Sequence, residues 1–103
     1  MKRIINGKTY NTDTANYIDD YSNGLGNRDF NNINEELYIT DNGVFFLSGS
    51  GGPMTKYSHP VGNMTSGGSD IFPLSKIEAL SWMECHGKIE DIEEYFSDLV
   101  EDA

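Results

Sequence analysis

The sequence has few of the features that mark secreted, membrane-spanning or disulfide-rich proteins. Its one cysteine, Cys85, has no second cysteine with which to form an internal disulfide. No apolar run approaches the roughly 20 residues that a membrane helix needs, and the first residues lack the apolar segment of a secretory signal. These absences predict a soluble protein of a reducing cytoplasm.

Basic side chains are also scarce. Seven Lys and Arg residues stand against seventeen Asp and Glu residues, which gives a net charge of −10 at pH 7. Direct binding of DNA or RNA through phosphates needs clustered Lys and Arg, so the composition argues against it. A surface this negative favours basic partners, including the nucleic-acid groove of another protein. Acidity that merely keeps a small protein soluble is the alternative explanation.

Length and composition predict a single domain over residues 1–103, without an internal repeat or a linker. The apolar fraction, 37%, is below the globular average, but twelve aromatic residues partly compensate because each buries a large area.

Turn signals divide the first half of the chain. Asn6-Gly7 lies between two β-favouring runs and predicts a hairpin over residues 2–10. Near-helical spacing of Ala15, Ile18 and Tyr21 predicts a short helix over residues 13–22.

The stretch over residues 36–57 predicts the central hairpin. A polar turn at residues 41–43, ending in Gly43, separates two apolar runs, and glycines follow the second run. Glycines in a strand mark a bend or a place where another backbone approaches closely. The polar segments on either side are expected to be loops, from which Phe30, Ile33, Val61 and Met64 point into the core.

Two helices are predicted in the last third. Ser75 and Glu78 form a capping box for a helix that ends at Gly87, and an amphipathic pattern predicts a second helix over residues 89–100. The chain is therefore expected to be an α+β domain, with a small antiparallel sheet built on two hairpins and about three helices packed mainly on one side. The expected core is Ile5, Ile18, Leu37, Ile39, Phe45, Leu47, Ile77, Leu80, Trp82, Ile92 and Phe96.

Cys85 and His86 suggest a metal site or a nucleophile, but zinc needs about four ligands at a characteristic spacing, and this chain offers one Cys and two His. Adjacent residues of a helix point to different sides, so a catalytic dyad would need His59 to approach Cys85. We expect no catalytic residue, no metal and no cofactor, with a Cys85-dependent activity as the minor alternative.

A second candidate site is the glycine-rich segment Gly49, Ser50, Gly51 and Gly52. Its backbone amides could form a nest for an anion or a small ligand, or its glycines could serve a close backbone approach.

The third candidate is the acidic C-terminal region. Its carboxylates are little compensated, because Lys88 is the only basic residue after Lys76. The expected partner-binding surface comprises Glu90, Asp91, Glu93, Glu94, Asp98, Glu101 and Asp102.

Several short motifs occur in the order seen in a family of small acidic proteins carried by bacterial phages and other mobile elements. They are Tyr10, Thr12, Thr14 and Ala15; Glu36, Leu37 and Tyr38; Gly43 with Phe45, Phe46 and Leu47; Gly51, Gly52, Thr55 and Tyr57; and Pro73, Leu74 and Ser75 followed by Ala79 and Trp82. The chain resembles this family over most of its length, and some such proteins are associated with anti-CRISPR activity.

The resemblance implies an inhibitor in the cytoplasm of a bacterial host, and it supplies no catalytic residues. Together with the charge, it leads to the hypothesis of an anti-CRISPR-like DNA mimic that binds a basic surface of a CRISPR-Cas effector and blocks nucleic-acid binding. The alternative is a ligand-binding or protein-interaction module that uses the glycine-rich segment.

Overall fold

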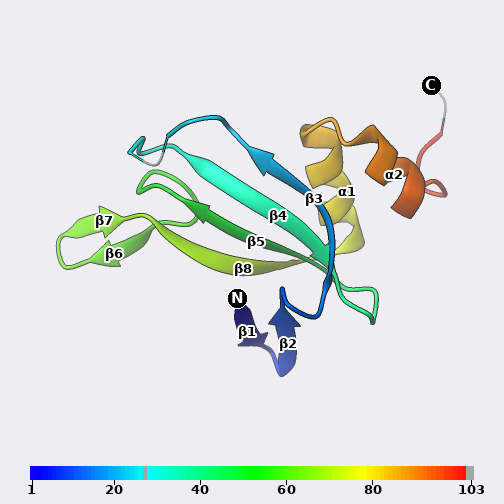
Figure 1. Cartoon of the computed structure of the whole chain (residues 1–103), viewed down its shortest axis with the longest axis horizontal. Helices are drawn as coiled ribbons and strands as arrows, with labels where there is room; N and C mark the ends of the chain where they lie inside the picture. The colour runs from blue at the N-terminus through cyan, green and yellow to red at the C-terminus, as the bar shows by residue number, and fades with distance from the viewer. Residues whose placement is uncertain (27, 102–103) are drawn as a thin grey trace.

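The computed structural model describes residues 1–26 and 28–101. Within these described residues, eight strands come first and two helices last (Figure 1). Their bounds are β1 Lys2–Ile5, β2 Lys8–Asn11, β3 Asn16–Ser22, β4 Ile33–Ile39, β5 Phe45–Gly51, β6 His59–Val61, β7 Met64–Ser66, β8 Gly68–Leu74, α1 Lys76–Cys85 and α2 Ile89–Tyr95. The chain is thus an α+β protein whose sheets are antiparallel.

The main sheet has four strands in the order β3-β4-β5-β8, and the β1–β2 and β6–β7 pairs form separate two-stranded sheets. Its register places Leu37 opposite Leu47 and Leu47 opposite Phe72, in one row across three strands. Because side chains alternate between the two faces of a strand, each such row belongs to one face of the sheet.

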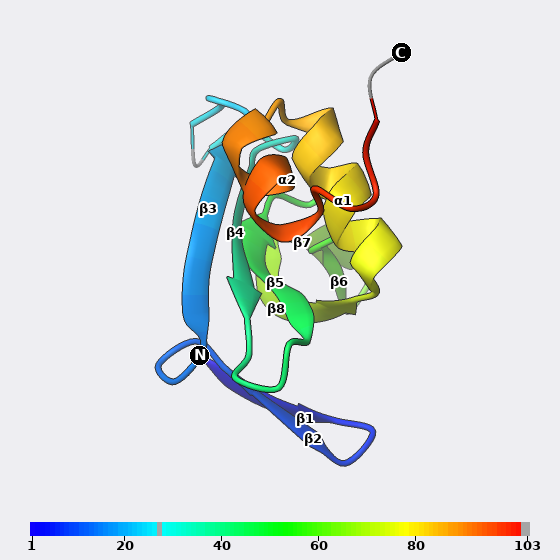
Figure 2. The ribbon, with the colours of Figure 1, turned by 90° about the vertical axis from the view of Figure 1, so that its right-hand side faces the viewer.

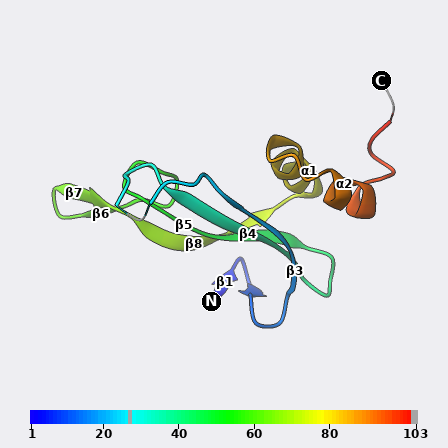
Figure 3. The same ribbon diagram turned by 45° about the horizontal axis from the view of Figure 1, so that its top comes forward.

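The two faces of the sheet are covered by different elements. Figures 2 and 3 show α1 and α2 over one face and the β1–β2 hairpin against the other. On the helix face, Leu37, Leu47, Trp82 and Phe96 belong to one buried cluster. On the opposite face, a second cluster buries Tyr10, Tyr38, Phe46 and Ile71. The β1–β2 hairpin covers only part of its face, which leaves the rest of that face open.

The local signals for turns and caps are confirmed. Asn6 and Gly7 both have positive φ, as their turn requires, and Gly43 closes the central hairpin with a φ of 81°. At the start of α1, Ser75 accepts a hydrogen bond from the Glu78 amide, and the Glu78 carboxylate accepts one from the Ser75 amide.

The helix predicted over residues 13–22 is wrong: this segment holds β3, so the described residues contain two helices rather than about three. A bulge between Tyr17 and Asp19 shifts the register against β4. The bulge lets Ile18 and Tyr21, three residues apart, both pack against the helix-face cluster. The three-residue spacing that suggested a helix is therefore produced by a bulged strand.

The second C-terminal helix is shorter than predicted and ends at Tyr95. Its first residue has no side-chain cap, and its last turn has no basic residue to interact with the helix dipole. Glu90 and Glu94 also repel each other at i,i+4. These features favour a short helix, which is followed by a turn in which the Leu99 amide donates to the Phe96 carbonyl.

Four residues expected in the core are exposed instead. Ile77 lies on the outer side of α1 and is 71% exposed, and the other three are Phe30, Val61 and Met64. The β6–β7 hairpin that carries Val61 and Met64 was expected to be a loop. The structure places Phe30 and this hairpin beyond the edge of both clusters.

None of the helices in the described ranges is long and apolar enough to cross a membrane.

Candidate functional site

A buried carboxylate lies at the centre of the helix face. Glu35 on β4 is 4% exposed and accepts hydrogen bonds from the Tyr57 hydroxyl at 2.5 Å and the Trp82 indole at 3.2 Å. The Lys56 ammonium lies 2.6 Å from the same carboxylate. Burial alone would raise the pKa of Glu35, but these three donors outweigh burial and lower it. Glu35 is therefore an ionised, fully partnered link between β4, α1 and the loop before β6.

The glycine-rich segment faces the same network. A Cβ at Gly49 would overlap the Tyr57 hydroxyl and ring, and one at Gly51 would overlap Thr55. A Cβ at Gly52 would lie 2.5 Å from the Phe30 carbonyl oxygen. On this face the space beside the glycines is thus filled by the chain's own residues, which is the close approach that glycine permits.

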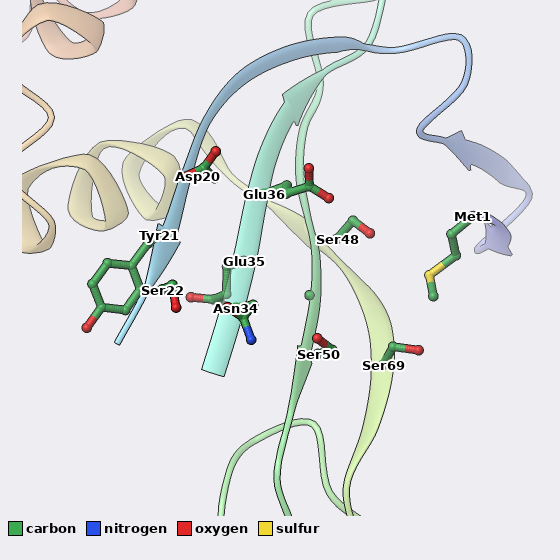
Figure 4. Close-up of a pocket in the computed structure, with 11 residues that line it drawn as sticks. Met1, Asp20, Tyr21, Ser22, Asn34, Glu35, Glu36, Ser48, Ser50 and Ser69 are labelled. Carbon is green, nitrogen blue, oxygen red and sulfur yellow. The ribbon is translucent and has the colours of Figure 1, made fainter. Parts of the chain in front are cut away.

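The opposite face of the same strands is open and polar. A groove of about 370 Å³ lies over β3, β4, β5 and β8 (Figure 4). Two rows of paired positions lie along it: one joins Asp20, Glu36 and Ser48, and the other joins Ser22, Asn34, Ser50 and Ser69. Ser50 of the glycine-rich segment therefore belongs to this groove.

The first of these rows holds two like charges. Asp20 is paired directly with Glu36 across β3 and β4, and both side chains are exposed. The Tyr17 hydroxyl donates a hydrogen bond to Asp20, and that bond raises the pKa of Tyr17. Like charges directly opposite each other destabilise a sheet. The fold therefore tolerates an electrostatic cost at this position.

A second like-charge pair lies next to the first along β3. Asp19 is beside Asp91 of α2, and the Lys88 ammonium lies 3.2 Å from Asp19. Burial, followed by the hydrogen bond and the charge of Asp19, raises the pKa of Asp91 to about 6. Burial would raise the pKa of Asp19 too, but hydrogen bonds from Asp91, the Asp20 amide and Lys88 lower it.

Together these residues extend the acidity of α2 around the edge of the sheet. Glu90, Glu93 and Glu94 on α2 are exposed, as are Asp98 and Glu101 beyond it. Asp91 instead faces β3, and Asp102 lies outside the described residues. We call the whole set the acidic surface: Asp19, Asp20, Glu36, Glu90, Asp91, Glu93, Glu94, Asp98 and Glu101.

Sequence reasoning found the helical part of this surface and missed the part on the sheet. Asp19 and Asp20 were assigned to a helix, and nothing local indicates that Glu36 lies opposite Asp20. The alternation of Glu36 with Leu37 could have indicated that Glu36 points away from the core. Glu35 was missed because a charged residue is rarely buried unless it is paired, and its partners lie far away in the sequence.

The structure does not bring the candidate cysteine and histidine together. Cys85 is exposed at the end of α1, whereas His59 lies on β6 at the other end of the molecule (Figure 1). His86 stacks on Tyr21, with ring centroids 3.8 Å apart, and packs edge-on against Trp82. Within residues 1–26 and 28–101, no group of three or more His, Cys, Asp or Glu side chains could hold a metal ion.

Comparison of the chain with protein-family models, with curated proteins and with solved structures found no match.

The Asp19–Asp91 pair predicts a pH dependence of stability. The Asp91 pKa rises from 3.8 to about 6 on folding, so between these values the folded protein holds a proton that the unfolded chain has lost. Stability should therefore fall as the pH rises through this window. Asp91→Asn should remove this fall and stabilise the protein by about 1 kcal/mol at pH 8.

Urea unfolding at pH 4, 6 and 8 measures this effect. Glu93→Gln, which removes one exposed charge from the same helix, is the control. It should leave the fall in stability with rising pH unchanged. An Asp91→Asn variant that is no more stable than the wild type at pH 8 would contradict the assignment.

Proposed function

We propose that this chain is an anti-defence protein of a phage or mobile element, an anti-CRISPR-like inhibitor. In this proposal it binds a CRISPR-Cas effector through the acidic surface and blocks nucleic-acid binding. The observation that carries the proposal is the pair of like-charge contacts on consecutive residues of β3: Asp19 with Asp91, and Asp20 with Glu36. Both cost stability, and a basic partner would relieve the exposed Asp20–Glu36 pair.

The chemistry of the acidic surface suits a competitor of nucleic acid. Its carboxylates would occupy the Arg and Lys side chains that otherwise contact phosphates. Lys88, the basic residue nearest to α2, is already paired with Asp19. It therefore neutralises little of the charge on the other carboxylates of the acidic surface. Attraction between exposed charges is screened by salt, so binding should weaken as the ionic strength rises.

Binding to a panel of CRISPR effectors at low ionic strength tests the proposal. The double variant Glu93→Gln/Glu94→Gln should bind a responsive effector about 10-fold more weakly, since each exposed charge pair contributes up to about 1 kcal/mol. Asp13→Asn/Asp41→Asn removes the same charge from exposed positions outside the acidic surface, and it should change affinity much less. If no effector binds even at low ionic strength, the proposal fails.

A second candidate function is the binding of a small polar ligand in the groove over Ser48, Ser50 and Ser69. The serine-lined open face favours it. A thermal-shift screen with nucleotides and sugars tests it, because a specific ligand raises the melting temperature by mass action. Uniformly flat shifts would argue against it.

A further inference from the structure

The end of the molecule farthest from the helices carries an exposed apolar patch. Its large side chains are Phe30, Met54, Val61 and Met64, which are 62%, 68%, 55% and 75% exposed. With Pro53 they form what we call the tip patch. A hollow of about 480 Å³ is lined by four of these five residues, with Met54 next to it. Figure 1 shows β6 and β7, which carry Val61 and Met64, at the opposite end of the long axis from α1 and α2.

Backbone contacts hold the tip patch in place. The Gly52 amide donates to the Asn32 carbonyl at 2.9 Å, and the Met54 amide donates to the Phe30 carbonyl at 2.9 Å. Residues 52–54 therefore run directly along residues 30–32. This backbone contact fills the space between the two segments, so the side chains of Phe30 and Met54 are presented outward.

The size of the tip patch indicates a weak interface. Its exposed apolar area is on the order of 500 Å², within the range of the largest patch on a typical monomer, and such patches often have a function. A stable interface of standard size buries about 800 Å² on each partner. The tip patch therefore fits an association that forms at high protein concentration.

The distribution of charge along the chain indicates which partner binds the tip patch. The described segments that build the tip, residues 23–26, 28–33 and 51–69, contain Arg28, Lys56 and Asp29 as their charged residues, so the tip is close to neutral. The remaining sixteen acidic and five basic residues give the rest of the chain a net charge of −11. Two copies of the chain would repel each other wherever these acidic parts meet. They would not repel each other where their two tips meet. A basic partner would gain little attraction here.

The flanking charges are self-complementary. Arg28 and Asp29 are both exposed and lie immediately before Phe30. In a two-fold interface each residue faces a counterpart on the other copy, so Arg28 of one copy can lie opposite Asp29 of the other. We propose that the tip patch is a self-association surface, through which two copies of this chain form a weak, two-fold dimer.

Sedimentation equilibrium of the full chain, from micromolar to millimolar concentration, tests the proposal. The dimer should form in the upper part of this range, and high salt should strengthen it because it screens the repulsion between the acidic bodies. Met64→Asp and Phe30→Ser should each weaken it by about 10-fold or more. Ile77→Asp, an equally exposed apolar position on α1, is the control and should leave it unchanged.

A charge-swap experiment tests whether Arg28 of one copy lies opposite Asp29 of the other. Arg28→Glu should weaken the dimer, and the double variant Arg28→Glu/Asp29→Arg should restore it. A chain that stays monomeric over the whole range, or a dimer that Met64→Asp leaves intact, would overturn the proposal. If the chain is monomeric and Met64→Asp instead abolishes binding of another protein, the patch serves a different occupant and the proposal is equally overturned.

Discussion

Replacing Glu35 by alanine should lower the free energy of unfolding by about 3 kcal/mol. The change leaves the Tyr57 hydroxyl and the Trp82 indole without their acceptor, and both side chains are buried. An unsatisfied buried donor costs about 1–3 kcal/mol. Lys56 is half-exposed, so its ammonium can return to water at little cost.

Urea unfolding measures the loss as a shift of the midpoint at constant slope. Glu36→Ala, at the next residue along β4, is the control. Glu36 is exposed and lies opposite Asp20, so its removal should be neutral or slightly stabilising. If Glu35→Ala is no more destabilising than Glu36→Ala, the buried network does not hold the helix face together.

Replacing Gly49 by alanine should destabilise the protein by a similar amount, about 3 kcal/mol, at the upper end of the cost of overpacking. The added methyl group would overlap the hydroxyl and ring of Tyr57, and that ring packs beside Phe72. Because Tyr57 also donates to Glu35, its displacement would break a buried hydrogen bond as well.

A double-mutant cycle separates this mechanism from a general effect on the strand. When Tyr57→Ser has already removed the ring, Gly49→Ala should cost much less than in the wild type. Gly26→Ala is the control, because a Cβ there meets no atom within 4 Å and should change stability by less than about 0.5 kcal/mol. Additive effects of Gly49→Ala and Tyr57→Ser would contradict the proposed overlap.

The features that could be predicted from the sequence are those specified by neighbouring residues. The Asn6-Gly7 turn, the turn at Gly43 and the Ser75–Glu78 capping box each depend on side chains within three positions of one another. The fold class, α+β with antiparallel strands, could be predicted from these turn and cap signals and from the apolar runs between them.

The features that could not be predicted depend on contacts between distant residues. β3 is a strand because it pairs with β4, and its bulge imitates helical spacing. Phe30 and Met54 are exposed because the backbone at Gly52 lies against residues 30–32. In the candidate site, the acidity of α2 was visible in the sequence, but its continuation onto β3 and β4 depends on strand pairing.

The most direct test of the proposed function is displacement of labelled nucleic acid from a CRISPR effector that binds this chain. The fluorescence anisotropy of the labelled strand would be followed as the chain is added, at several salt concentrations. We expect complete displacement that weakens as salt rises, with Asp20→Asn/Glu36→Gln displacing the nucleic acid less well than the wild type. An effector that binds the chain and its nucleic acid at the same time, or a displacement indifferent to salt, would contradict it.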